Sequence, residues 1–209
     1  MLSPSIASAR LTKEQAEAPG HARSVPCRPP YRPPGSTIYA ARMTSYPART
    51  WFDPRLELRT SPIQGQGLFV TGDVAPDEVL MVWGGTVYSV AQLRAGEVPG
   101  GISYSIVDDD VLLAGPEDDL DYYLNHSCDP NAWLADGLRI VARRPIRAGE
   151  EITGDYALWE SEPEYVLAPC RCGAALCRGR ITGQDWTNVE LRRRYAGHFL
   201  PFLQRRMVP

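Results

Sequence analysis

The chain of 209 residues lacks any run of 18 apolar residues, so no segment is long enough to cross a membrane as a helix. It also lacks an excess of positive charge, because the formal net charge is −3 and the isoelectric point is about 5.7. This balance excludes a general nucleic-acid-binding protein. The N-terminal stretch has no apolar core of the kind found in secretory signals. We therefore expect a cytoplasmic protein if the source is bacterial, whereas another source leaves the localisation open.

Cysteine is scarce and odd in number, with five residues in the chain. An odd count without a secretory signal argues against a framework of disulfide bonds. Cys27 lies within residues 1–50, which are rich in Pro, Ala, Ser and Arg and show no hydrophobic period. We predict that residues 1–50 are a disordered extension. Met43 is an alternative start of the protein.

Short strands separated by Gly and Pro are expected from Trp51 onward, which predicts a mostly β fold of small curved sheets. The Asp136-Gly137 pair is a strong signal for the turn of a hairpin. The expected strands lie at 56–60, within 61–70, twice within 77–90, and in two hairpins over 103–115 and 131–146. A helix of two turns is expected over 89–96.

The C-terminal part predicts a helix over about 187–197 that ends near Gly197, followed by a short helical or irregular stretch. Thr187 and Glu190 have the spacing of a capping box, in which each side chain bonds the backbone N–H of the other. The rough apolar stripe of this helix consists of Val189, Leu191, Tyr195 and Phe199.

Charge is distributed unevenly along the chain. Residues 108–129 contain no Lys or Arg, whereas the tail from Arg178 is rich in arginine. The acidic run is either a solvated face or a surface that attracts a cationic substrate. Its acidic residues are Asp108, Asp109, Asp110, Glu117, Asp118, Asp119, Asp121 and Asp129.

Three cysteines form a C-x-C-x4-C cluster at Cys170, Cys172 and Cys177. Thiols at this spacing suit a tetrahedral soft-metal site, which needs a fourth ligand. Cys128 is the remaining cysteine outside the extension, so we predict a four-thiolate zinc site. Two other interpretations are three unligated cysteines, and Cys128 as a nucleophile with His126 as its base.

The motifs "GQG" (65–67), "NHSCDPN" (125–131), "GEEITGDYA" (149–157) and "CRCGAALCRGR" (170–180) occur in the order found in SET-domain methyltransferases. The chain resembles this family over roughly 54–182, and its tail resembles that of small microbial SET proteins. The resemblance implies a SET fold of small curved β-sheets with a pseudoknot. It divides the chain into a SET domain at 54–160, a post-SET zinc segment at 166–182 and a C-terminal helical tail at 183–209.

The same resemblance implies that the protein binds S-adenosylmethionine and methylates a lysine of a basic protein or peptide, without a direct nucleic-acid or membrane partner. Tyr156 matches the catalytic tyrosine of the family. Trp83 occupies the place of a cofactor-contacting aromatic, although a core tryptophan explains it equally well. The implied cofactor-binding residues are Gly65, Gln66, Gly67, Leu68, Asn125, His126, Tyr156 and Ile181. The implied zinc ligands are Cys128, Cys170, Cys172 and Cys177.

Two positions differ from the family pattern. Gly154 stands where the family usually has an aromatic residue that limits methylation, so the acceptor pocket is either wider or filled by Trp159 or Tyr123. Tyr122 stands where the family often has an arginine near the cofactor carboxylate. Two other functions remain open: an enzyme acting on a small amine or another non-protein nucleophile, and a catalytically weak zinc-bearing interaction module.

Overall fold

The computed structural model describes residues 46–207. The N-terminal sheet strands are β1 (Trp51–Phe52), β2 (Leu56–Thr60), β3 (Gln66–Val70), β4 (Val79–Val82), β5 (Thr86–Tyr88), β6 (Ile102–Asp108) and β7 (Val111–Pro116). The later strands are β8 (Asn125–His126), β9 (Ala132–Leu134), β10 (Arg139–Ala142), β11 (Glu151–Gly154), β12 (Val166–Leu167) and β13 (Ile181–Thr182). The α-helices are α1 (Val90–Arg94), α2 (Val189–Arg194) and α3 (Pro201–Met207), and short 3-10 helices cover Leu120–Tyr123, Tyr156–Leu158 and Asp185–Thr187.

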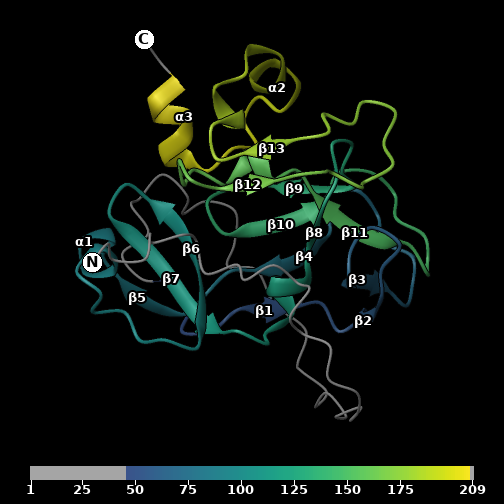
Figure 1. The fold of residues 1–209 in the computed structure, drawn as a ribbon. Helices are drawn as coiled ribbons and strands as arrows, with labels where there is room; N and C mark the ends of the chain where they lie inside the picture. Colours follow the sequence, from purple (N-terminus) through teal and green to yellow (C-terminus); the bar gives the residue numbers. More distant parts are fainter. Residues whose placement is uncertain (1–45, 208–209) are drawn as a thin grey trace, which may run out of the picture.

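The strands form several small sheets, which confirms the expected mostly β fold (Figure 1). Within residues 46–207, one sheet has the order β1-β4-β10-β9, and a second has the order β2-β3-β11-β8. A third sheet has the order β5-β7-β6, and β12 pairs with β13. β8 is parallel to β11, with Asn125 opposite Thr153 and His126 opposite Gly154, whereas the other named pairs are antiparallel.

Local sequence signals account for the turns between these strands. The Asp136 carboxylate accepts the backbone N–H groups of Leu138 and Arg139, each at 2.9 Å, and so closes the predicted hairpin between β9 and β10. Ser89 and Gln92 form a capping box at the start of α1. Both sets of bonds join residues a few positions apart, so local sequence can indicate such turns and helix starts.

The C-terminal helix differs from the prediction at both ends. The cap is Asn188, whose side chain accepts the N–H groups of Glu190 and Leu191, and α2 ends at Arg194. The Thr187 hydroxyl instead donates to the Gln184 carbonyl, 2.8 Å away, within the preceding 3-10 helix. Val189 is 78% exposed and does not belong to the apolar stripe, whereas the other three predicted members are buried.

The last residues of the predicted extension, 46–50, belong to the part of the chain that the structure describes. Residues 1–45 lie outside the described residues. Thr50, placed in the predicted extension, is buried, and its hydroxyl exchanges hydrogen bonds of 3.2 and 3.3 Å with the Gly84 backbone. A Cβ on Gly84 would lie 2.4 Å from the Arg49 carbonyl oxygen. This contact uses backbone and hydroxyl groups, so no hydrophobic pattern announces it.

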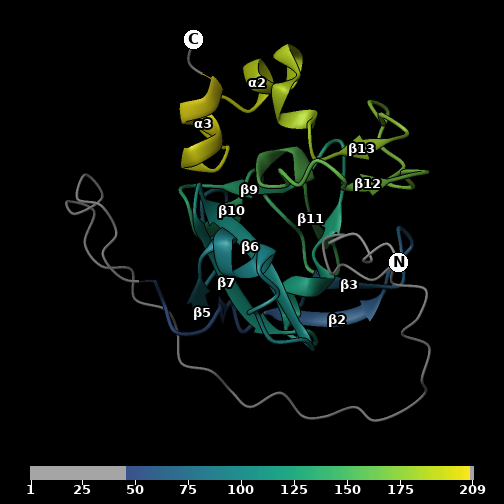
Figure 2. The same ribbon diagram turned by 60° about the vertical axis from the view of Figure 1, so that its left-hand side comes forward.

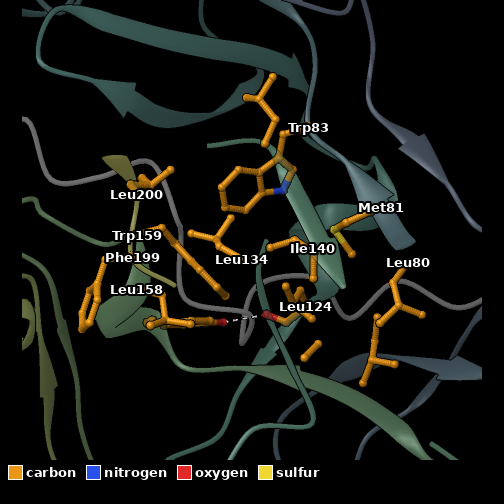
Figure 3. Packing of buried hydrophobic residues seen from close by; sticks show 14 of the residues in the cluster. Leu80, Met81, Trp83, Leu124, Leu134, Ile140, Leu158, Trp159, Phe199 and Leu200 are labelled. Carbon is orange, nitrogen blue, oxygen red and sulfur yellow. Dashed lines mark hydrogen bonds between the residues drawn. The ribbon is translucent and has the colours of Figure 1, made fainter. Parts of the chain in front are cut away.

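A single apolar cluster joins the sheets to the C-terminal tail. Leu80, Met81 and Ile140 reach it from β4 and β10, and Phe199 and Leu200 reach it from the segment before α3 (Figure 3). Burying a side chain of this size stabilises the fold by about 1.5–3 kcal/mol. The helices α2 and α3 lie at one end of the molecule, and β1, β2 and β3 lie toward the other (Figure 1 and Figure 2). Among residues 46–207, no helix has the length and apolar character needed to span a membrane.

Candidate active site and metal centre

The parallel pairing of β8 with β11 brings His126 against Tyr156. The Tyr156 backbone N–H donates to His126 Nδ1 at 3.2 Å, and the two ring centroids lie 5.1 Å apart. Burial lowers the pKa of His126 to about 4, even though the Asp155 carboxylate raises it, so the imidazole is neutral near pH 7. Because Nδ1 accepts a hydrogen bond, Nε2 carries the proton of the neutral ring.

The Tyr156 side chain is fixed inside the domain. Only 7% of the residue is exposed, and its hydroxyl donates to the Leu124 carbonyl at 2.8 Å. The rings of Trp159 and Tyr165 lie beside it, with centroids 5.9 and 6.1 Å from that of Tyr156. The hydroxyl therefore has a defined position within an aromatic wall, as a residue that orients a reacting group requires.

Trp159 fills the space beside Gly154. A Cβ on Gly154 would lie 2.2 Å from Trp159 Cη2, so a side chain at residue 154 and the present position of the indole exclude each other. Trp159 is 5% exposed and packs edge-on against Trp83 at 5.5 Å (Figure 3). Trp83 is thereby a core residue. The sequence left Trp159 and Tyr123 as candidates to fill the space beside Gly154. Trp159 fills it, whereas Tyr123 packs against Tyr122.

Asn125 connects the glycine-containing loop to the sheet. Its side-chain NH₂ group lies 2.6 Å from Glu151 Oε1 and 3.1 Å from the Gln66 carbonyl oxygen. A Cβ on Gly67 would lie 2.0 Å from Glu151 Oε1 and 3.0 Å from the Asn125 amide nitrogen. Residue 67 must therefore be glycine in this structure, because the Glu151 and Asn125 side chains occupy the space that a Cβ would need.

A small pocket opens beside these residues, and the space between its walls, open solvent included, is about 280 Å³. Asn125, His126 and Tyr156 of the predicted cofactor set line it. Leu68 and Ile181 are fully buried in the core cluster and do not line it, and Gly65, Gln66 and Gly67 lie just after its Gln64 wall. The remaining lining residues, which sequence reasoning missed, are Ile63, Gln64, Leu167, Pro169, Cys170 and Arg171.

A cluster of soft donor atoms lies next to the pocket. The ligand atoms of His126, Cys128, Cys170 and Cys172 all lie within 4.8 Å of one another. Cys177 is not in that group, but its thiol lies 3.7 Å from the Cys170 carbonyl and is a hydrogen-bond partner of the Cys170 and Cys172 thiols. The backbone N–H of Arg178 donates to Cys128 Sγ at 3.3 Å. These donors fit a zinc ion, which prefers four nitrogen or sulfur ligands.

The hydrogen bonding of His126 separates two possible ligand sets. His126 Nε2 lies 3.3 Å from Cys128 Sγ. Because Nε2 carries the ring proton, it donates to that sulfur and cannot bind a metal at the same time. This favours Cys177 as the fourth ligand, with His126 as a hydrogen-bond donor to Cys128. Burial raises the pKa of the Cys128 thiol, as expected for a thiol whose thiolate needs a neighbouring cation.

Arg178 links the cysteine cluster to the active-site segment. Its guanidinium makes two bonds of 2.7 Å to the fully buried Asp155 carboxylate and one of 3.1 Å to Asp185. Asp155 directly precedes Tyr156, and its carboxylate accepts the Ala157 N–H. A paired guanidinium is what allows a carboxylate to be buried at all. The arrangement ties the C-terminal segment to the turn that carries Tyr156.

Residues 65–157 match the family model described as "SET domain". This part of the chain is a SET domain. Relatives of the SET domain include the histone-lysine N-methyltransferase trr of Drosophila melanogaster, 32% identical over 134 residues. They also include the histone-lysine N-methyltransferase, H3 lysine-4 specific, of Cryptococcus neoformans (33% over 140 residues) and the histone-lysine N-methyltransferase set-2 of Caenorhabditis elegans (36% over 140 residues).

The alignments with these three relatives cover 58%, 60% and 60% of this chain. They cover only 6%, 10% and 9% of the relatives, respectively. The similarity thus supports the SET domain, and the aligned part is a tenth or less of the length of each of these relatives.

Within the SET domain, the acidic run pairs with the C-terminal helix α3. Asp109 forms ion pairs with Arg205 and Arg206 of α3, at 3.0 and 2.7 Å, and Asp108 also pairs with Arg205. The hydrogen bond from Arg205 is the main cause that lowers the pKa of Asp109. Two carboxylates of the run are therefore neutralised by the tail, which weakens the interpretation of this run as a rim for a cationic substrate.

Proposed function

We propose that the chain is an S-adenosylmethionine-dependent protein-lysine N-methyltransferase, which transfers a methyl group to a lysine side-chain amine. The SET-domain match and the histone-lysine methyltransferase relatives support this proposal. The structural observation that carries it is the pocket in which Asn125 and His126 of β8 meet Tyr156. That pocket combines polar groups with the apolar side chains of Ile63 and Leu167, so it fits an amphipathic ligand.

The cofactor, when bound, supplies an electrophilic methyl group on a positively charged sulfonium. Tyr156, the one of the three clustered aromatic residues that lines the pocket, is a suitable neighbour for such a cation, because aromatic faces attract positive charge. Asn125 and His126 contribute the polar edge of the pocket. The neutral state of His126 also avoids a repulsive charge next to the cofactor.

The acceptor amine must be neutral before it can attack. A lysine with the reference pKa of about 10.4 is neutral in roughly 0.1% of molecules or less near pH 7, a cost of about 4–5 kcal/mol. Burial beside the aromatic wall and a nearby positive charge lower that pKa. Tyr156 needs to move no proton: its oxygen, held by the bond to Leu124, can accept an amine N–H and align the lone pair.

The cysteine cluster serves this reaction through structure. We propose that Cys128, Cys170, Cys172 and Cys177 bind one zinc ion, which holds the segment between β12 and β13 against the pocket. Leu167, Pro169 and Cys170 of that segment line the pocket, so its position determines the shape of the pocket. Metal binding thereby contributes folding energy to a wall of the site.

The alternative of a small-amine substrate rested on extra space at Gly154. The position of Trp159 in that space supports a narrower acceptor site. A basic protein or peptide segment is therefore the substrate class we propose.

The test is incubation of the purified protein with methyl-labelled cofactor and, in separate reactions, basic peptides, protein lysate and small amines. Label in lysine side chains that is absent with Tyr156→Phe supports the proposal. Label only in small amines favours the second enzyme class. Cofactor binding without any transfer favours an interaction module.

A further inference from the structure

The 3-10 helix that carries Tyr156 begins at a buried carboxylate. Asp155 is its N-cap, because the carboxylate accepts the Ala157 N–H at 3.0 Å, and the residue has no exposed surface. A carboxylate can be buried with its charge only when a cation lies beside it. Arg178 provides that cation through two bonds of 2.7 Å, one to each oxygen. The start of the helix therefore depends on a side chain that lies 23 residues later in the chain than Asp155.

Arg178 is also held on the side away from Asp155. Its Nε donates to Asp185 at 3.1 Å, and its backbone N–H donates to Cys128 Sγ at 3.3 Å. Asp185 in turn accepts the Thr182 hydroxyl at 2.8 Å. The guanidinium therefore has a fixed plane, and its two parallel N–H groups determine the orientation of the Asp155 carboxylate.

The two ends of this 3-10 helix are held by different groups. At its end, the Leu158 carbonyl accepts the Leu200 N–H at 2.9 Å, which is a main-chain bond that a side-chain substitution elsewhere leaves in place. At its start, the Asp155–Arg178 pair holds the residue directly before Tyr156. Loss of the pair should therefore displace the start of the helix, where Tyr156 lies, more than its end.

The cofactor side of the pocket is held separately from this ion pair. His126 belongs to β8, and the pairing of β8 with β11 places it opposite Gly154. Neither Asp155 nor Arg178 lines the pocket. A change in the ion pair should therefore affect the alignment of Tyr156 more than the binding of the cofactor.

We propose that Arg178 is a positioning residue for methyl transfer, which sets the place of the Tyr156 hydroxyl by orienting Asp155. The effect on the reaction rests on the proposed function, whereas the effect on the position of Tyr156 does not. A displacement of about 1 Å in an aligning group can lower a rate by about 100-fold. A guanidinium that fixes the start of the helix is therefore important for turnover without contacting the substrate.

Steady-state kinetics and cofactor titration test the effect on the reaction. We expect Arg178→Gln to lower kcat by about 10- to 100-fold, with the cofactor Kd, the KM of the peptide and the zinc content nearly unchanged. Arg178→Lys keeps the charge but loses the two parallel N–H groups, so its kcat should lie between those of Arg178→Gln and the wild type.

A double variant keeps the test valid if the single variant does not fold. Arg178→Gln leaves the Asp155 carboxylate buried without its partner, which is destabilising in itself. Arg178→Gln combined with Asp155→Asn removes both charges and keeps an oxygen that can accept the Ala157 N–H. We expect this variant to fold, to retain zinc and to show the same loss of kcat. Wild-type kcat in the double variant overturns the proposal.

Arg194→Gln is the matched control. The Arg194 side chain is 23% exposed, against 18% for Arg178, and it also joins the C-terminal part of the chain to the SET domain. Its bonds of 3.1 and 2.6 Å end at the Cys128 carbonyl and the Asp129 carboxylate instead of the turn that carries Tyr156. We expect kcat to stay close to that of the wild type. An equal loss of kcat in Arg194→Gln means that general loosening of the tail explains the effect, and this overturns the proposal.

Fluorine NMR of protein labelled with 3-fluorotyrosine measures the surroundings of Tyr156 without turnover. The signal of Tyr156 is the one that disappears in Tyr156→Phe. We expect this signal to shift or broaden in Arg178→Gln and in the double variant, and to stay in place in Arg194→Gln. An unchanged Tyr156 signal in both Arg178 variants overturns the positioning role even if the proposed function stands. Absence of methyl transfer by the wild type overturns the proposed function, and the fluorine signal then still decides whether Arg178 holds Tyr156.

Discussion

The two four-stranded sheets and the cysteine segment are held together by different forces. The core strands β4 and β10 pair through three residue pairs and bury side chains such as Leu80 and Ile140 completely. The segment between β12 and β13 has strands of two residues, and its Cys177 is exposed. Hydrophobic burial stabilises the sheets, whereas the segment depends on soft donor atoms and ion pairs. The pocket lies where these two regions meet.

Metal removal is the strongest way to break this comparison. We expect one zinc per chain by elemental analysis, and we expect a strong chelator to lower cofactor affinity by about tenfold or more. Cys172→Ser and Cys177→Ser should each have a similar effect, while far-ultraviolet circular dichroism of the sheets stays close to that of the wild type.

The opposite variant is Ile140→Ala, in the fully buried core. It should cost about 2–5 kcal/mol of unfolding free energy and leave the zinc content unchanged.

Full zinc retention in Cys177→Ser, together with its loss when His126 is replaced by Gln, would contradict the ligand set favoured here.

Tyr156→Phe separates alignment from binding within the pocket. It removes the bond to the Leu124 carbonyl but keeps the ring, so the aromatic wall stays in place. We expect turnover to fall by about 10- to 100-fold with little change in cofactor affinity, because the hydroxyl acts on the alignment of the transition state. Single-turnover kinetics and titration measure the two quantities. An unchanged rate with every substrate shows that the hydroxyl has no part in the reaction.

Trp159→Phe sharpens the comparison at the edge of the core. The Trp159 indole N–H has no hydrogen-bond partner among residues 46–207. Replacing the indole by the smaller phenyl ring therefore removes packing contacts but no hydrogen bond. We expect a loss of about 1–3 kcal/mol of unfolding free energy and a shift of products toward higher methylation states. Mass spectrometry of a methylated peptide measures that shift. A product distribution equal to that of wild type means that Trp159 does not limit the acceptor space.

Neutralising Asp108 and Asp109 should have the smallest effect. Exposed ion pairs contribute about 0–1 kcal/mol each, so the double Asn variant should destabilise the docking of α3 slightly, and less at high salt. Because the folded-state pKa of Asp109 is lowered, its contribution is present above the unfolded-state pKa and disappears as the pH falls through the folded-state value. Denaturation at several pH values measures this. A several-fold rise in KM for a basic peptide would instead revive the acidic rim as a substrate surface.

Features that depend on neighbouring residues were predictable from the sequence. The Asp136-Gly137 turn and the Ser89 helix start each satisfy backbone groups a few residues away. The predicted helix cap at Thr187 was wrong. Thr187 and the adjacent Asn188 can both cap a helix, and the preceding 3-10 helix decides that Asn188 does so. The resemblance to the SET family named Asn125, His126 and Tyr156 together, and the structure places all three at one pocket.

Features that depend on distant parts of the chain were not predictable. The residue type of Trp159 does not reveal that its ring fills the space at Gly154. Asp109 meets Arg206 across 97 residues of sequence, and Arg171 reaches the pocket because the cysteine loop folds back on β8. Such placements follow from the packing of whole elements, which no local pattern encodes.

The parallel contact between β8 and β11 has a consequence for the order of synthesis. Asn125 and His126 can pair with β11 only after residues 153 and 154 have left the ribosome. The Cys128 carbonyl must wait longer, because its hydrogen-bond partner Tyr195 is synthesised 67 residues later. Contacts this far apart in sequence form slowly, because a long loop must close before they contribute. During translation the sheets can therefore gain structure while the His126 and Cys128 segment still waits for its partners, and the pocket is completed last.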